Sequence, residues 1–87
     1  MKIKDGYISK SVAGSYIVVP VGSRRFESIM TLSEGGAYLF EILKTGAERD
    51  ELVQALCAEY DVDTATAEAD TDEFIESLKS AGLIDER

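Results

Sequence analysis

The chain of 87 residues is long enough for one domain with a small core, and its composition, 45% hydrophobic and 30% charged, is typical of a globular protein. Its 17 acidic residues outnumber nine basic ones, and the resulting net charge of −8 argues against binding to a nucleic-acid backbone. The absence of histidine and the single cysteine exclude the usual zinc sites and an internal disulfide.

The apolar pattern also argues against a membrane protein. The sequence contains no run of about 18 apolar residues, the length that a spanning helix needs. The first five residues lack the apolar block of a secretory signal. We therefore expect a cytoplasmic protein that does not associate with membranes.

The first third of the chain predicts short antiparallel strands. Residues 7–12 alternate weakly, and residues 16–21 are rich in β-branched side chains. The connection at 13–15 contains a glycine, so we expect these two strands to form a hairpin. Pro20 cannot donate to a strand ladder, which predicts an unpaired or irregular position there. Residues 26–32 alternate again and predict a third strand.

From residue 33 the apolar period changes from that of a strand to that of a helix. Three helices are expected, at 33–45, 48–60 and 63–81. Ser33 and Asp63 are suitable N-caps, because their side-chain oxygens accept hydrogen bonds from free backbone N–H groups. The pattern predicts a single α+β domain over the whole chain, with a three-stranded antiparallel sheet followed by three helices in a winged-helix-turn-helix-like arrangement.

Two adjacent glycines fall in the first turn of the first predicted helix. Each costs about 1 kcal/mol relative to alanine within a helix, so Gly35 and Gly36 need a reason. One interpretation is close approach of another backbone, and the other is tolerance near a frayed helix end. The sequence favours neither.

No catalytic machinery is evident in the sequence. Without histidine, a general base near neutral pH would have to be a perturbed carboxylate or lysine. The acidic residues around Asp70 and Glu73 are interpreted as a solvated helix face, and no calcium-type loop is present. We therefore expect a protein that is not an enzyme and has no catalytic residue, metal site or cofactor. An open edge of a small sheet could instead accept a peptide as an added strand.

The segment MTLSEGGAYLFEILKTG at 30–46, followed by DELVQAL at 50–56 and YDVD at 60–63, resembles the PqqD family. This is the peptide-chaperone family of pyrroloquinoline quinone (PQQ) biosynthesis, and its fold also serves as the RiPP recognition element, where RiPP denotes a ribosomally made, modified peptide. The similarity extends from about Tyr7 to Ile84. Ser33 stands where the family often has asparagine, and this exchange keeps an oxygen that can cap a helix.

The resemblance implies a winged-helix-like domain that binds the leader of a precursor peptide. In such a domain the leader lies as an added strand along the third strand, in the groove beside the third helix. The bound leader is thereby delivered to a modifying enzyme, often a radical SAM protein. The expected partners are thus the precursor peptide and that enzyme, and the chain is expected to be a monomer or a weak homodimer.

Carried onto this sequence, the groove comprises the third strand and one flank of the third helix. Ile75 is the expected apolar anchor, with core packing as an equal alternative, and Lys79 is the expected partner of an acidic leader. The implied peptide-binding residues are Phe26, Glu27, Ser28, Ile29, Met30 and Thr31 on the strand and Glu68, Thr71, Asp72, Ile75 and Lys79 on the helix.

An alternative function is an acidic winged-helix regulator that dimerises or binds a protein partner in transcription control. A carrier-like subunit is a third interpretation. Acyl carriers place a serine at the start of a helix within four helices, and the strand-rich first third of this chain argues against that class.

Overall fold

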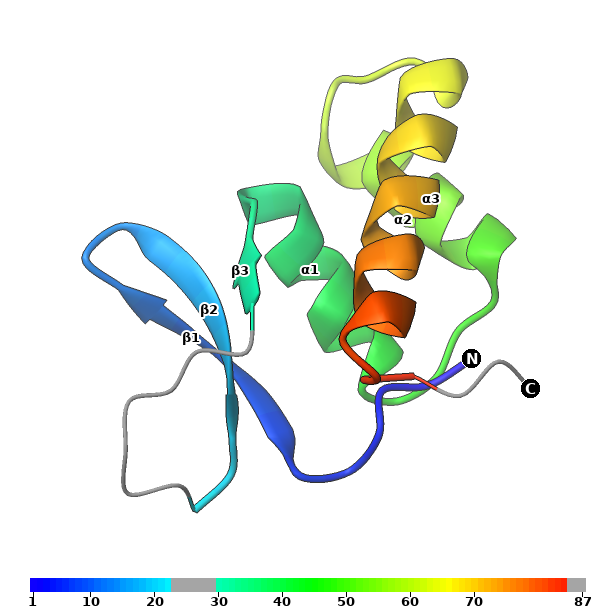
Figure 1. Ribbon diagram of the computed structural model, residues 1–87. Coiled ribbons are helices and arrows are strands. Elements are labelled where there is room, and N and C mark those ends of the chain that lie inside the picture. Colours follow the sequence, from blue (N-terminus) through cyan, green and yellow to red (C-terminus); the bar gives the residue numbers. More distant parts are fainter. Residues whose placement is uncertain (23–29, 85–87) are drawn as a thin grey trace.

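The computed structural model describes residues 1–22 and 30–84. Within them, three strands precede three helices (Figure 1): β1 (Tyr7–Val12), β2 (Ser15–Pro20), β3 (Met30–Leu32), α1 (Glu34–Leu43), α2 (Arg49–Glu59) and α3 (Thr64–Ser80). The α+β class, with a three-stranded antiparallel sheet followed by helices, is confirmed. The predicted third strand began at residue 26, and its positions 26–29 lie outside the described residues.

The β1–β2 hairpin closes through a two-residue turn. Ala13 and Gly14 have φ values of 51° and 83°, the left-handed conformation that two-residue hairpin turns require. The expected connection, 13–15, was one residue longer, so β2 begins and ends one residue earlier than expected. Pro20 is the last residue of β2 and lies opposite Tyr7 at the end of the ladder.

The sheet has the order β1-β2-β3, which leaves β3 at one edge. In the register of β2 and β3, Tyr16 lies opposite Leu32 and Val18 opposite Met30, so these four residues share one face of the sheet. Val18 and Leu32 on this face belong to the hydrophobic core. The sheet therefore presents this face to the helices.

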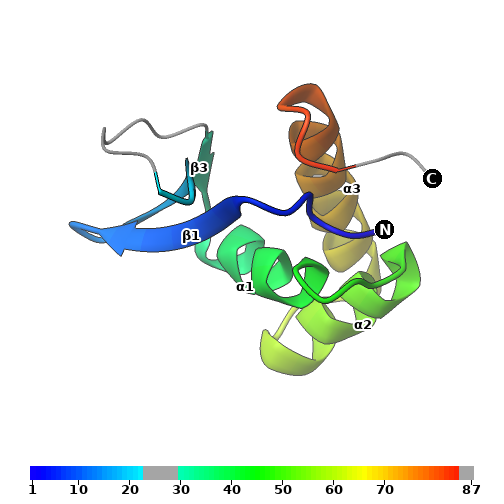
Figure 2. The same cartoon turned by 90° about the horizontal axis from the view of Figure 1, so that it is seen from below.

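The helices surround the core on one side of the sheet. α1 contacts β1, β3 and α2, and Figure 2 shows it between β1 and α2. α2 packs mainly against α3. The largest fully buried side chains of the helices are Leu39, Phe40, Leu43, Leu52 and Leu78. The N-terminal segment closes the far end of this core, because Ile3 forms an isolated β-bridge with Ile84.

Both predicted N-caps form. The Ser33 hydroxyl accepts a hydrogen bond from the Gly36 N–H at 3.0 Å, and the Asp63 carboxylate accepts one from the Thr66 N–H at 2.8 Å. Hydrogen bonding from Thr66 holds the pKa of Asp63 below its usual value. The caps fix where β3 ends and α1 begins, and where α3 begins.

Candidate functional site

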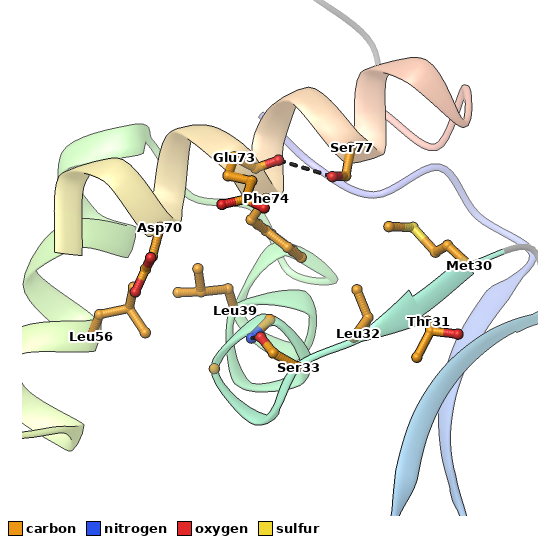
Figure 3. A pocket seen from close by; sticks show the side chains of 12 residues that line it. Met30, Thr31, Leu32, Ser33, Leu39, Leu56, Asp70, Glu73, Phe74 and Ser77 are labelled. Atoms are coloured by element: carbon orange, nitrogen blue, oxygen red, sulfur yellow. Dashed lines mark hydrogen bonds between the residues drawn. The ribbon is translucent and has the colours of Figure 1, made fainter. Parts of the chain in front are cut away.

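A cavity of about 420 Å³ lies between β3 and α3. Its strand wall is formed by Met30, Thr31 and Leu32, and its helix wall by Asp70, Glu73, Phe74 and Ser77. The start of α1 and Leu56 of α2 complete the lining. Figure 3 shows the side chains of Met30 and Leu32 from β3 and of Phe74 from α3 pointing into the space between the two elements.

The floor of the cavity is apolar. Leu32, Leu39, Leu56 and Phe74 are all buried, with Phe74 7% exposed, and all four line the cavity. In Figure 3 the Phe74 ring projects from α3 toward the space above α1. An apolar side chain that entered here would lose contact with water and gain packing partners, at about 25 cal/mol per Å² of apolar surface buried.

The two glycines of α1 shape this floor. A Cβ on Gly36 would lie 3.3 Å from the Ser33 hydroxyl oxygen and 3.6 Å from Leu32, whereas one on Gly35 would lie 3.7 Å from Leu56. The atoms close to Gly36 thus belong to side chains and not to another backbone, while Gly35 has room for a methyl group. Both glycines line the cavity, so their missing side chains keep it open.

The rim of the cavity is polar and acidic. Asp70, Glu73 and Ser77 are exposed on α3, and the Ser77 hydroxyl donates to the Glu73 carbonyl oxygen at 3.0 Å. No described residue forms an ion pair with Asp70 or Glu73. An apolar floor with a polar rim is typical of a site for a peptide or small ligand.

The backbone of β3 adds directional binding capacity to this cavity. β3 pairs with β2 on one side only within the described residues, so its other side is a sheet edge. Thr31 is exposed and Met30 is half-buried at this edge. Unpaired N–H and C=O groups on an edge strand form a ready template for a further strand.

The structure brings two of the sequence-predicted site residues to the cavity, Met30 and Thr31. Four others, Phe26, Glu27, Ser28 and Ile29, lie outside the described residues. The five predicted residues on α3, which are Glu68, Thr71, Asp72, Ile75 and Lys79, are not among those that line the cavity. The opposite flank of α3 faces β3 instead.

The predicted flank of α3 has other contacts. Thr71 is fully buried, and Ile75, 6% exposed, packs in the core, as its alternative interpretation had it. Asp72 accepts two hydrogen bonds from the Arg49 guanidinium of α2, at 2.6 and 3.0 Å. Glu68 lies 3.5 Å from the same guanidinium, and Lys79 is exposed. The Arg49 hydrogen bonds hold the pKa of Asp72 below its usual range.

Sequence reasoning missed the cavity residues of α3. Asp70 and Glu73 are interpreted as a solvated face from the sequence, and Phe74 and Ser77 are not among the predicted site residues. Ser77 follows Phe74 and Glu73 at helical spacing, which places all of them near one side of α3. The helical period therefore predicts that these residues lie near one another on α3. It does not predict which side of α3 faces β3.

Neither a cluster of metal ligands nor a membrane-spanning helix is found in the part of the chain that the structure describes. No group of three or more acidic or cysteine side chains within 1–22 and 30–84 is arranged to hold a metal ion. None of the helices in these ranges is both long and apolar enough to cross a bilayer.

The fold and the site together define a small winged-helix-like domain in which a sheet edge borders an apolar cavity under a helix. The chain belongs to the PqqD family, since the family described as "Coenzyme PQQ synthesis protein D (PqqD)" matches residues 16–84. Among curated proteins, no significant match was found.

Two solved structures share the fold. The chain is similar to TbiB1, in a structure of its complex with the TbiA(beta) leader peptide, with a TM-score of 0.73 and 28% sequence identity over 100% of this chain and 98% of that one. It is also similar in fold to a lasso peptide synthetase B1 complexed with the leader peptide. That match has a TM-score of 0.67 and 21% identity over 94% of this chain and 93% of the other.

Proposed function

We propose that this protein binds the leader segment of a ribosomally synthesised precursor peptide and presents it to a modifying enzyme. The leader adds as a strand to the free edge of β3 and sets an apolar side chain into the cavity beneath α3. The protein itself performs no chemistry. The observation that carries the proposal is that, within residues 1–22 and 30–84, an unpaired strand edge and an apolar cavity lie at the same place.

The family and the similar structures support this proposal. TbiB1, which covers the whole of this chain, was solved with a leader peptide bound. The second protein, similar in fold, was also solved with a leader peptide. PqqD-family membership is consistent with a binding protein that acts beside an enzyme.

Backbone hydrogen bonds and the apolar cavity would contribute differently to peptide binding. Backbone hydrogen bonds along β3 would set the register of the peptide and would be insensitive to its sequence. Selectivity would come from the side chain that enters between Leu32, Leu39 and Phe74, because only an apolar group matches that lining. The peptide-binding residues that we propose from the cavity are therefore Met30 and Thr31 on the strand, with Asp70, Glu73, Phe74 and Ser77 on the helix.

The proposal is tested with a synthetic peptide that carries the leader of the precursor encoded beside this gene. Chemical-shift changes on titration should cluster on residues 30–33 and 70–77. Shifts that cluster elsewhere, or an affinity that does not depend on the leader sequence, would refute the proposal. Retention of the protein on DNA at physiological salt would instead favour the regulator.

A matched pair of variants tests the cavity itself. Ser77→Phe places a ring at the mouth of the cavity and should weaken leader binding about tenfold or more, equivalent to at least about 1.4 kcal/mol. Glu76→Phe adds the same ring at an exposed position on α3 that does not line the cavity, and its affinity should stay within about twofold of the wild type. Equal effects of the two substitutions, measured by calorimetry on variants with unchanged circular dichroism, would show that the cavity takes no part.

The finer proposal concerns the partner enzyme, which we propose is a radical SAM maturase. Modification of the precursor by the neighbouring maturase should be faster with this protein than without it, and a precursor lacking its leader should show no such difference. An equal rate with and without the protein would contradict the role in presentation.

A further inference from the structure

A second hollow, of about 390 Å³, lies between α1 and the β1–β2 hairpin. It shares no lining residue with the cavity beneath α3, and its residues come from the other side of α1. Three tyrosines, Tyr16, Tyr38 and Tyr60, line it together with Glu34 and Glu41. The proposed leader site uses none of these side chains.

The three rings come from three different elements. Tyr16 lies on the helix-facing side of β2, Tyr38 lies on α1, and Tyr60 caps the C-terminus of α2. The rings of Tyr38 and Tyr60 pack edge to face, with centroids 5.9 Å apart and planes at 84°. All three tyrosines are half-buried, so each ring keeps part of its surface open. Side chains of this kind are enriched where proteins contact one another.

The charges around the rings are negative. Glu34 lies one helical turn before Tyr38, and no described residue forms an ion pair with it. Partial burial raises the pKa of the Tyr60 phenol, and the negative charge of Glu34 raises it further. The negative charge of Glu41 is partly compensated, because its carboxylate lies 3.7 Å from the Lys44 ammonium.

Aromatic faces beside a carboxylate form an environment for an organic cation. The face of an aromatic ring carries negative charge density and attracts a cation within about 6 Å. A guanidinium is planar and weakly hydrated, and it can stack on a ring while it donates hydrogen bonds to a carboxylate. The net charge of −8 also favours a partner with a basic surface.

We infer that this tyrosine hollow, defined by Tyr16, Tyr38, Tyr60 and Glu34, receives an arginine side chain of a second protein while the leader occupies β3. The inference rests on the proposed function, and the second protein is the enzyme to which the leader is presented. Because the hollow and the leader cavity share no residue, both ligands can bind at once.

The probe for this inference is N-acetyl-glycyl-arginyl-glycinamide, with its citrulline analogue as a neutral control of nearly the same shape. In an NMR titration of the whole chain, ring signals of the three tyrosines should shift and saturate with a dissociation constant of about 1–10 mM. The citrulline peptide should cause no saturable shift at the same concentrations. Equal responses to both peptides, or an arginine response away from these rings, would overturn the inference.

Matched variants separate the contribution of the Glu34 charge from that of the tyrosine rings in binding of the arginine peptide. Glu34→Gln should weaken binding of the arginine peptide about two- to fivefold, whereas Glu76→Gln, an exposed acid on α3, should change it less than about 1.5-fold. Tyr60→Phe keeps the ring and should bind within about twofold of the wild type, and Tyr60→Leu should lose about fivefold. A Tyr60→Phe variant as weak as Tyr60→Leu would overturn the stacking role.

Two further measurements distinguish other outcomes. If the tyrosine signals move with protein concentration and light scattering shows a dimer, the hollow takes a second copy of this chain and the inference is overturned. Leader binding at residues 30–33 and 70–77 is measured on the same Glu34→Gln variant and should be unchanged. If the wild type does not bind the leader peptide, the proposed function is refuted. The titration with the arginine peptide tests the tyrosine hollow separately.

Discussion

Substitution of Thr71 by valine should make this protein more stable. Thr71 is fully buried on α3, and its hydroxyl oxygen has no hydrogen-bond partner among the described residues. Valine has nearly the same shape and a similar helix propensity, so the exchange replaces an unsatisfied buried hydroxyl by a methyl group of similar size.

The size of the effect follows from the cost of an unsatisfied polar group. A buried donor or acceptor without a partner costs about 1–3 kcal/mol relative to a satisfied one. Because Thr71 is fully buried and its hydroxyl has no partner among the described residues, we expect a gain of about 1–2 kcal/mol in the free energy of unfolding. In a domain of this size, each kcal/mol corresponds to about 4–8 °C in the midpoint of thermal unfolding.

Urea denaturation of the wild type, Thr71→Val and Thr71→Ser measures this effect. Serine keeps the hydroxyl and loses the methyl group, so it should be about 1 kcal/mol less stable than the wild type. A valine variant no more stable than the wild type would refute the reasoning and would mean that the hydroxyl has a partner. Leader affinity should be unchanged in Thr71→Val, because Thr71 does not line the cavity.

Substitution of the two glycines of α1 by alanine should change the stability of the protein to different extents. Gly35→Ala has room for its methyl group 3.7 Å from Leu56 and should raise the free energy of unfolding by about 0.5–1 kcal/mol. The methyl group of Gly36→Ala would lie 3.3 Å from the Ser33 hydroxyl, so this variant should bring no gain. A Gly36→Ala variant more stable than Gly35→Ala in denaturation curves would contradict this assignment. The lowered pKa values of Asp63 and Asp72 predict that their stabilisation is present above about pH 4 and is lost as the pH falls through the folded-state values. The double variant D63N/D72N should therefore lose less stability than the wild type between about pH 5 and pH 2 in urea titrations, and parallel curves for the two proteins would count against it.

Much of the fold could be predicted from local patterns. The change from strand to helix period at Ser33 is a property of consecutive residues, and so are the caps at Ser33 and Asp63. The family resemblance depended on the segment at 30–46, and the match over 16–84 bears it out. The turn at Ala13 and Gly14 was placed less well, because alanine rarely adopts a positive φ and the sequence gives little sign of it.

The sequence pattern indicated only some of the residues that line the cavity, for a reason specific to helix packing. Met30 and Thr31 of the predicted strand side line the cavity, and their contact with a peptide stays a prediction. The helix side was chosen by angular position around the core stripe, which leaves two flanks equivalent. On one flank of α3, Asp72 accepts a hydrogen bond from Arg49 of α2. The other flank, with Glu73, lines the cavity beside β3.

The sequence by itself determined the class of the domain, the order of its elements, its acidity and its family, because each of these depends on composition or on neighbouring residues. Only the tertiary structure decided that Asp70, Glu73, Phe74 and Ser77 share a cavity with β3, and that three tyrosines from β2, α1 and α2 meet around a second hollow. These groupings join residues far apart in the chain. The physical reason is that the side of α3 that meets the sheet depends on how α2 and α3 pack, which no local period specifies.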